Sequence, residues 1–309
     1  MTRRDERPFE MRNPSTPRDA TFRRTMTECS KAASEGNLQE LKRLHESGFS
    51  WDANTCVEAA KGGHLECLKY AHEQGCPWGR LRVPSDPWEA EFTCEAAAQG
   101  GHLECLKYAH ENGCPWDECV CETAASWGHL ECLKYLHENG CPWDERTCEL
   151  AALQDEPKCL KYAHENGCPW YEITCRAAAG GGHLECLKYL HDNGCPWDEH
   201  ACEAAAECGN LECLKYLHEN QCPWNEETCK KAVLHYEEGW PGALECLQYA
   251  RDHGCPCPFT PPECPIESAM MALDQVKRRV PDHLYREIAG GLMYAHRAKK
   301  YQISNKLNL

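Results

Sequence analysis

The sequence lacks the patterns that would assign it to a common class of enzyme or membrane protein. Its first residues, MTRRDERPFEMRNP, contain no apolar stretch, and no hydrophobic run approaches the length that spans a bilayer. No glycine-rich phosphate loop follows a strand pattern, and no order of serine, histidine and aspartate suggests hydrolysis. We therefore expect no secretory signal, no membrane association, no cofactor and no enzymatic activity, and a location in the cytosol or nucleus.

The cysteines also lack the spacing that is typical of metal sites. The chain has 26 cysteines among 309 residues, and no two of them form a Cys-x-x-Cys pair. In a cytosolic or nuclear protein such thiols stay reduced, and a reduced cysteine behaves as a small hydrophobic residue. We interpret most of these cysteines as core residues.

The net charge of −16 is distributed unevenly along the chain. Residues 1–26 hold seven arginines and four acidic residues, and residues 260–309 hold eight basic and five acidic residues. The segment between them holds 18 basic and 40 acidic residues, a net charge of −22. Such a segment repels phosphate backbones, so we expect no binding of nucleic acid. A basic partner surface, or the chain's own basic ends, fits this charge better.

One stretch of sequence, Thr93 to Cys119, recurs with small changes along most of the chain. Numbered from its first cysteine as position 0, it has Gly-His at +7 and +8, Cys at +11, His at +16 and Cys-Pro-Trp at +20 to +22. Position 0 recurs at steps of 27 residues, apart from one step of 38. Such a fixed period predicts a stacked array of repeats. The position 0 cysteines of copies 1 to 8 are Cys29, Cys56, Cys94, Cys121, Cys148, Cys175, Cys202 and Cys229.

Each copy predicts two short helices, which we call helix A and helix B, joined by a tight turn. In copy 3, Thr93 at position −1 is expected to cap helix A, which continues through alanines to a Gly-Gly pair. Helix B is expected over residues 103–112, where a glycine and then a proline end it. Helices this short are unstable alone, so neighbouring copies must stabilise them.

Comparison among the copies separates a constant side of helix A from a variable one. At about 100° per residue, positions 0, +3, +4 and +7 share one arc, and they hold Cys, Ala, Ala and Gly in most copies. Positions +1, +2, +5 and +6 share the opposite arc and differ from copy to copy. We expect the constant side to be packed. On helix B, a narrow polar stripe is expected to face solvent, with Lys107 and Glu111 as an ion pair.

Residues Ala96 to Gly113, AAAQGGHLECLKYAHENG, resemble the core of an ankyrin repeat, and the match recurs at Ala124–Gly140 and Ala178–Gly194. The resemblance covers residues 27 to 259. The period of 27 residues departs from the family's, which is about 33, and it leaves little room for the family's β-hairpin finger. Arrays with this Gly-Cys-Pro-Trp spelling are similar to those of protists and large DNA viruses. The resemblance implies a protein-binding scaffold and no reaction.

We therefore predict an all-α, ankyrin-like helix-turn-helix solenoid of about eight repeats that is monomeric and binds a protein partner. The resemblance and the variation among copies place the partner on the variable side of helix A and the adjoining loops. The expected partner-binding residues are Val57, Glu58, Lys61, Glu95, Gln99, Glu122, Thr123, Ser126, Trp127, Glu149, Leu150, Leu153, Arg176, Glu203 and Glu207. Trp127 is either an exposed anchor or a residue packed over the neighbouring helix.

The remaining segments lie at the ends of the array and in one insertion. Residues 1–26 are expected to form a flexible basic tail, and residues 79–92 an inserted loop that is either a tolerated insertion or a binding finger. Residues 260–309 are expected to form a helical cap and a basic tail. Within them, Val280 to Leu292 resembles the opening of an F-box, so an adaptor of a ubiquitin ligase is an alternative function.

A second alternative is a metal-binding or redox protein. Each regular copy offers three cysteines and one histidine, a plausible zinc set, at Cys94, Cys105, Cys114 and His110 in copy 3. Cys105 and His110 are five residues apart on one helix, about 140° around its axis, and should face different neighbours. We therefore expect no metal.

Two histidines and one tryptophan in each copy are expected to be structural. The histidine at +16 should bond to the next copy, and the histidine at +8 should tie the turn between the helices. The tryptophans at +22 should form a ladder of structural pins along one edge, since aromatic side chains bury large areas.

Overall fold

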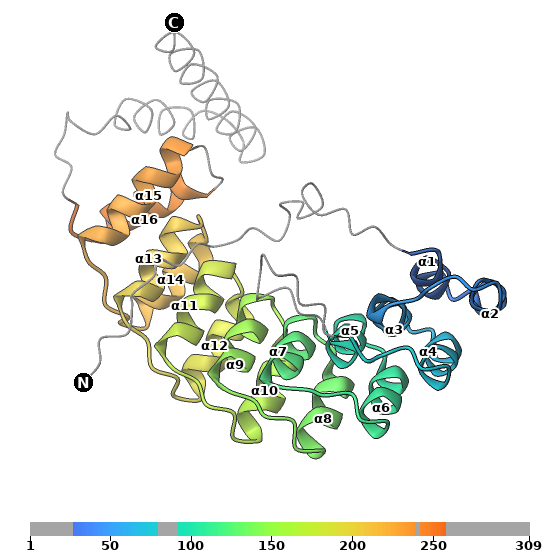
Figure 1. Cartoon of the computed structure of the whole chain (residues 1–309). Helices are drawn as coiled ribbons and strands as arrows, with labels where there is room; N and C mark the ends of the chain where they lie inside the picture. Colours follow the sequence, from blue (N-terminus) through green and yellow to red (C-terminus); the bar gives the residue numbers. More distant parts are fainter. Residues whose placement is uncertain (1–26, 80–91, 239–241, 258–309) are drawn as a thin grey trace, which may run out of the picture.

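The computed structural model describes residues 27–79, 92–238 and 242–257, which form sixteen α-helices in two stacked rows (Figure 1). No strand occurs in these ranges. Helix A of copies 1 to 8 is α1 (Glu28–Ser34), α3 (Ala53–Lys61), α5 (Thr93–Gly100), α7 (Glu118–Ser126), α9 (Glu145–Leu153), α11 (Glu172–Gly181), α13 (Glu199–Glu207) and α15 (Glu226–Glu238). Helix B is α2 (Leu38–Glu46), α4 (Leu65–Glu73), α6 (Leu103–Glu111), α8 (Leu130–Glu138), α10 (Pro157–Glu165), α12 (Leu184–Asp192), α14 (Leu211–Glu219) and α16 (Ala243–Asp252).

Successive helices A pack more closely than successive helices B, and the array bends as a result. Each helix A contacts the next helix A extensively, whereas successive helices B contact each other less. The residues between helices A are small, such as the fully buried Ala97 and Ala98, while helix B contributes bulkier ones such as Leu106. The helices A therefore line the inner side of an arc (Figure 1). The predicted all-α solenoid is confirmed.

Helix A begins earlier than the sequence pattern predicts. In copies 2, 4, 5 and 7 its N-cap is the aspartate at −4, whose carboxylate accepts the backbone N–H two residues further on. In copy 1 the cap is a threonine at −2, Thr27, whereas Thr147, at −1 of copy 5, is fully buried inside the first turn. Thr93 is the first residue of α5, and its predicted role as a cap is wrong. An aspartate also stabilises the positive end of the helix dipole, which a threonine does not.

Helix B ends within one residue of its predicted boundary, but its ion pair has a different register. The Lys107 Nζ lies 2.9 Å from Glu104 Oε1, one turn towards the N-terminus, so the predicted pair with Glu111 is wrong. In copy 5, Lys158 takes the place of that glutamate. There Lys161 Nζ instead forms an ion pair with Glu165 Oε1, at 3.8 Å.

In copies 2, 4 and 6 the Gly-His turn joins the copy to the one before it. The Nε2 of His129 lies 3.0 Å from the carbonyl oxygen of Gln99, near the end of helix A in the preceding copy. The same ring covers Gly101, where an added Cβ would lie 2.5 Å from His129 Nδ1. The histidine at +8 was expected to bond within its own turn. The bond instead crosses between copies, because Gly101 of the preceding copy has no side chain and leaves room for the ring of His129.

The cysteines form part of the core, as predicted. All 25 cysteines in the described ranges are free thiols. Only three of these are not buried, namely Cys119, Cys208 and Cys257. A free thiol packed among alanine and leucine contributes as a small apolar group.

Several predictions fall on segments outside the described residues. These are the N-terminal tail (1–26), residues 80–91 of the insertion, and the helical cap with its F-box-like segment (258–309). The division of the chain into tail, array and cap stays a prediction.

We expect Gly101→Ala to lower the free energy of unfolding by about 2–4 kcal/mol, from left-handed backbone strain and from overpacking. Gly101 has a φ of 72°, and the new methyl group would meet the ring of His129. Gly113→Ala is the matched control, because its φ is 82° but no heavy atom lies within 4 Å of the added Cβ. This control should lower the free energy of unfolding by only about 1–2 kcal/mol, from left-handed backbone strain alone. Urea denaturation followed by circular dichroism measures both, and equal losses would contradict the role of the His129 contact.

Candidate interaction surface

The variable side of the helices A forms one face of the array. We call the residues at +1, +2, +5 and +6 of copies 2 to 7 the A face; it lies on the row that lines the inner side of the arc (Figure 1). The predicted partner-binding residues on it are carried by α3 (Val57, Glu58, Lys61), α5 (Glu95, Gln99), α7 (Glu122, Thr123, Ser126), α9 (Glu149, Leu150, Leu153), α11 (Arg176) and α13 (Glu203, Glu207), with Trp127 at the C-cap of α7.

The residues of the A face differ strongly in exposure. Trp127 is 56% exposed and is one of only four large hydrophobic residues in the described ranges that are exposed. Val57, in contrast, is fully buried and belongs to the core, so its expected contact with a partner is corrected. Position +2 is also covered where it holds alanine, as at Ala96 and Ala177. The accessible part of the A face is therefore centred on the copies with larger side chains at +2, +5 and +6.

The carboxylates in the middle of the A face bond to the next copy. Thr123 Oγ1 donates a hydrogen bond of 3.4 Å to Glu95 Oε1. Arg146 Nε lies 3.1 Å from Glu122 Oε2, and only 11% of the Glu122 side chain is exposed. Glu95, Glu122 and Thr123 were predicted to contact a partner, but they also bond to side chains of neighbouring copies. Part of the variation among copies therefore reflects matched pairs between adjacent helices A.

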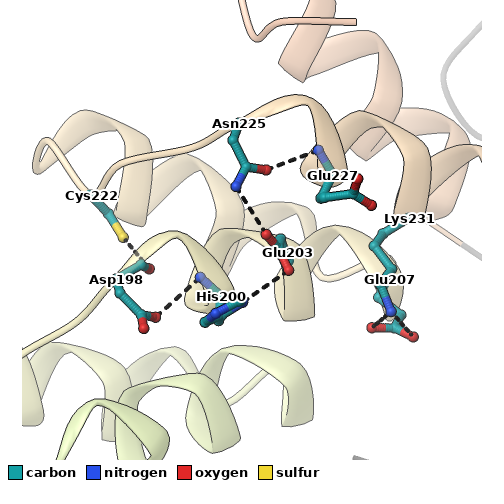
Figure 2. Close-up of polar contacts among 8 residues, drawn as sticks. All are labelled: Asp198, His200, Glu203, Glu207, Cys222, Asn225, Glu227 and Lys231. Carbon is teal, nitrogen blue, oxygen red and sulfur yellow. Dashed lines mark hydrogen bonds and ion pairs between the residues drawn. The ribbon is translucent and has the colours of Figure 1, made fainter. Parts of the chain in front are cut away.

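The same kind of pairing joins copies 7 and 8 (Figure 2). Glu203 accepts a hydrogen bond of 3.2 Å from Asn225 Nδ2, and its other oxygen lies 3.0 Å from His200 Nδ1. Asn225 also accepts the backbone N–H of Glu227 at 2.9 Å. One asparagine therefore caps α15 and bonds to the helix A before it.

Glu207 completes this junction by bonding to α15. Its carboxylate lies 3.1 Å from Lys231 Nζ (Figure 2). The Nε2 of His235 also lies 3.4 Å from Glu207 Oε1. Both partners belong to the next copy, so this predicted contact residue again pairs across copies.

Burial changes the electrostatics at the centre of the A face. Desolvation raises the pKa of Glu122 and Glu149, although the positive charge of Arg146 acts to lower both values. Arg176 also acts to lower the pKa of Glu149. A carboxylate that is partly removed from water is stabilised by an added positive charge more than an exposed one is. This part of the face is therefore suited to cationic groups.

Sequence reasoning missed several residues at the N-terminal end of the A face. Arg146 and His200, at −2, make the contacts described above, and Tyr171, at −4, is 50% exposed. Leu234, at +5 of copy 8, is 54% exposed. The first three were missed because helix A was expected to start near position 0. The Asp-Glu pairs at −4 and −3 were the available signal, since acidic residues favour a helix N-terminus.

A second repeated cluster, formed by helix B and the loop after it, is structural. The ring of His110 stacks on Trp116 of its own copy at a centroid distance of 3.5 Å, and its Nδ1 lies 2.9 Å from the Tyr135 hydroxyl of the next copy. The expected bond to the next copy is confirmed, and each tryptophan packs on a histidine and a tyrosine. The cluster recurs at His45–Trp51–Tyr70, His72–Trp78–Tyr108, His137–Trp143–Tyr162, His164–Trp170–Tyr189, His191–Trp197–Tyr216 and His218–Trp224–Tyr249.

Other sites were searched for within the described ranges. There, no three histidine, cysteine, aspartate or glutamate side chains converge as metal ligands. No helix of this part of the chain has the length and apolar character needed to cross a bilayer.

Comparison with known proteins agrees with this architecture. Residues 173–218, which span α11 to α14, match the family model of ankyrin repeats. A similar solved structure is that of the human ASB11 ankyrin repeat domain, with 23% identity over 54% of this chain and 84% of that chain and a TM-score of 0.47. No curated protein matches the chain. The fold is that of a helical-repeat solenoid. Two of its copies match the family model of ankyrin repeats, and the other copies repeat their motif in register.

We expect His110 to titrate below pH 6.5 and His200 above it. Desolvation lowers the pKa of His110, whereas the hydrogen bond with Glu203 raises that of His200. The stability that His110 contributes is complete above its unfolded pKa and is lost as the pH falls through its lowered pKa. The contribution of His200 is complete below its unfolded pKa and is lost as the pH rises through its raised pKa.

The pH dependence of the ring-proton NMR shifts tests this order. The variants His110→Gln and His200→Gln assign the two signals by their disappearance. One shared midpoint, or the reverse order, would contradict the buried and carboxylate-bonded environments of these rings.

Proposed function

We propose that this chain is a non-enzymatic scaffold that binds another protein on the A face. Ankyrin repeats generally mediate protein–protein interactions and are typically not catalytic. The observation that carries the choice of surface is Trp127, a tryptophan 56% exposed on the one side of helix A that differs from copy to copy. Exposed tryptophans are frequent anchors of protein interfaces, because they bury a large area on binding.

The other surfaces of the array support this choice by contrast. The solvent-facing stripe of helix B carries nearly the same Glu-Lys pair in copies 2, 3, 4 and 7, with distances of 2.8–3.2 Å. Identical exposed ion pairs contribute little energy and distinguish no position along the array. The A face instead presents a different set of side chains in each copy, which a specific partner requires.

Charge favours a partner with a basic surface. The array has a net charge of −22, and the A face contributes Glu58, Glu95, Glu149 and Glu203 to it. The raised pKa of Glu149 reflects a carboxylate that burial penalises. A lysine or arginine of the partner placed beside it would offset part of that penalty. We further propose that the scaffold is monomeric and does not bind nucleic acid.

The alternatives receive no specific support. The F-box-like segment Val280 to Leu292 lies outside the described residues, so the role of a ubiquitin ligase adaptor stays a prediction. A metal-binding protein would need converging ligands, and the described ranges contain no such group.

The test compares a variant of the A face in copies 4 and 5 with a variant of the opposite stripe in copy 4. The A-face variant carries alanine at Thr123, Ser126, Trp127, Leu150 and Leu153. The matched control carries alanine at Glu131, Lys134 and Glu138, on the exposed stripe of α8. Affinity capture and mass spectrometry under reducing conditions should recover a partner with the natural chain and the control only. Trp127→Ala alone should weaken binding of the purified partner about 30-fold, the loss typical of a hot-spot residue.

Circular dichroism must show equal helicity in all variants. If the A-face variant and Trp127→Ala retain the same partners at unchanged affinity, the A face is not the binding surface. Binding would then lie in the insertion or the terminal segments.

A further inference from the structure

A row of buried thiols runs through the array and has no part in the proposed function. The cysteines at position 0 lie in helix A and are fully buried, and those at +20 lie in the loop after helix B and are at most 5% exposed. Both kinds occur together in copies 2 to 8; copy 8 has six additional residues, so that its loop cysteine, Cys255, follows Cys229 by 26 residues. The pairs are Cys56 with Cys76, Cys94 with Cys114, Cys121 with Cys141, Cys148 with Cys168, Cys175 with Cys195, Cys202 with Cys222, and Cys229 with Cys255.

The thiol at position 0 lies against the backbone of the loop cysteine, whose own thiol lies against the backbone of the residue at −4. Cys56 Sγ is 4.0 Å from the carbonyl oxygen of Cys76, and Cys76 Sγ is 3.1 Å from the carbonyl oxygen of Asp52. Asp52 caps the helix whose first turns contain Cys56. The loop cysteine is therefore directed at the turn that carries its partner.

This arrangement recurs along the array. Cys94 Sγ lies 3.9 Å from the carbonyl oxygen of Cys114. The loop thiols of copies 4 to 8 lie 3.1–3.4 Å from the carbonyl oxygen of the residue at −4, as at Cys222 and Asp198 (Figure 2). In copies 2 and 3 the thiol at position 0 therefore lies beside the loop cysteine of the same copy. Such proximity allows a disulfide with little movement of the backbone.

The third buried cysteine of each copy, at +11, provides an internal contrast. Cys105 is 1% exposed, and its pKa is raised to about 11 by burial and by the charge of Glu104, with no other thiol involved. It is as protected as Cys94 but lies on helix B, in α6. Burial alone therefore does not distinguish the paired thiols; their mutual position does.

We propose that Cys94 and Cys114, and the equivalent pair in each of copies 2 to 8, form a site of reversible oxidation to a disulfide by a low-molecular-weight disulfide such as oxidised glutathione. This inference is independent of the A face. It assigns a chemical modification to residues that otherwise only fill the core.

The loop cysteine is the first nucleophile of the reaction. The hydrogen bond from Cys94 lowers the pKa of Cys114, while the pKa of Cys94 is raised. The Cys114 thiolate attacks one sulfur of oxidised glutathione, forms a mixed disulfide and releases one glutathione thiolate. Cys94 then loses its proton and attacks the Cys114 sulfur, which releases the second glutathione thiolate. The two protein thiols lose two electrons in total, and oxidised glutathione gains them.

The oxidised copy keeps its fold, because the new bond joins groups that already touch. It closes the loop between position 0 and position +20 within one copy and leaves the contacts between copies in place. A cross-link of this kind disfavours the unfolded chain. Reduced glutathione reverses the reaction by the same exchange.

The experiment treats the full-length chain with oxidised glutathione under native conditions, quenches with acid, alkylates free thiols and digests with trypsin. Oxidation of copy 3 should link the peptide 83–107, which contains Cys94, to the peptide 108–134, which contains Cys114. Cys114→Ser and Cys94→Ala should each lose this link, whereas the control Cys105→Ser should keep it. The link should form without loss of helicity by circular dichroism and disappear after addition of reduced glutathione.

Other products would overturn the proposal. These are alkylated Cys94 and Cys114 after treatment, glutathione adducts confined to the exposed Cys119, links between different copies, or a Cys94–Cys114 link that appears only in denaturant. Should Cys114→Ser unfold, Cys94→Ala decides the result, because alanine preserves a small apolar side chain at that position.

Discussion

Each helix A is too short to persist alone, and it is held by the helix A of the next copy through small side chains that leave no space between them. Ala97 and Ala98 of copy 3 are fully buried there, as is Cys94. The close approach has two consequences. It brings the row of helices A to the inner side of the arc, and it places their remaining side on the surface as a continuous face.

Two kinds of polar contact then set the register between copies. On the helix B side, a histidine stacked on a tryptophan bonds to the tyrosine of the next copy, in the same way at seven junctions. On the helix A side the pairs differ, as with Glu122–Arg146 and Glu207–Lys231. A constant contact maintains the stack, while a variable one lets each junction differ without loss of packing. The residues of the A face therefore support the stack, and under our proposal they also recognise a partner.

The sequence predicted the helices and the core well, because these depend on local pattern. The end of helix B in copy 3 was predicted within one residue. Gly113, with a φ of 82°, adopts the left-handed conformation that commonly ends a helix. The start of helix A was misplaced because a threonine at −1 and an aspartate at −4 are both good caps. In copy 5 the cap is Asp144, and tertiary packing buries Thr147 instead. The candidate surface was harder to predict. Val57 sits at a variable position and is nevertheless buried, because burial depends on neighbouring copies.

The sequence by itself determined the repeat, its two helices, its small-residue core and its acidic charge, because each follows from the period and composition of one chain segment. Tertiary structure alone decided which carboxylates pair across copies, which rings cover the glycines of the preceding copy, and that the thiols at position 0 and +20 meet. These contacts join residues about twenty or more positions apart. Their geometry depends on how closely the helices stack, which no local pattern encodes.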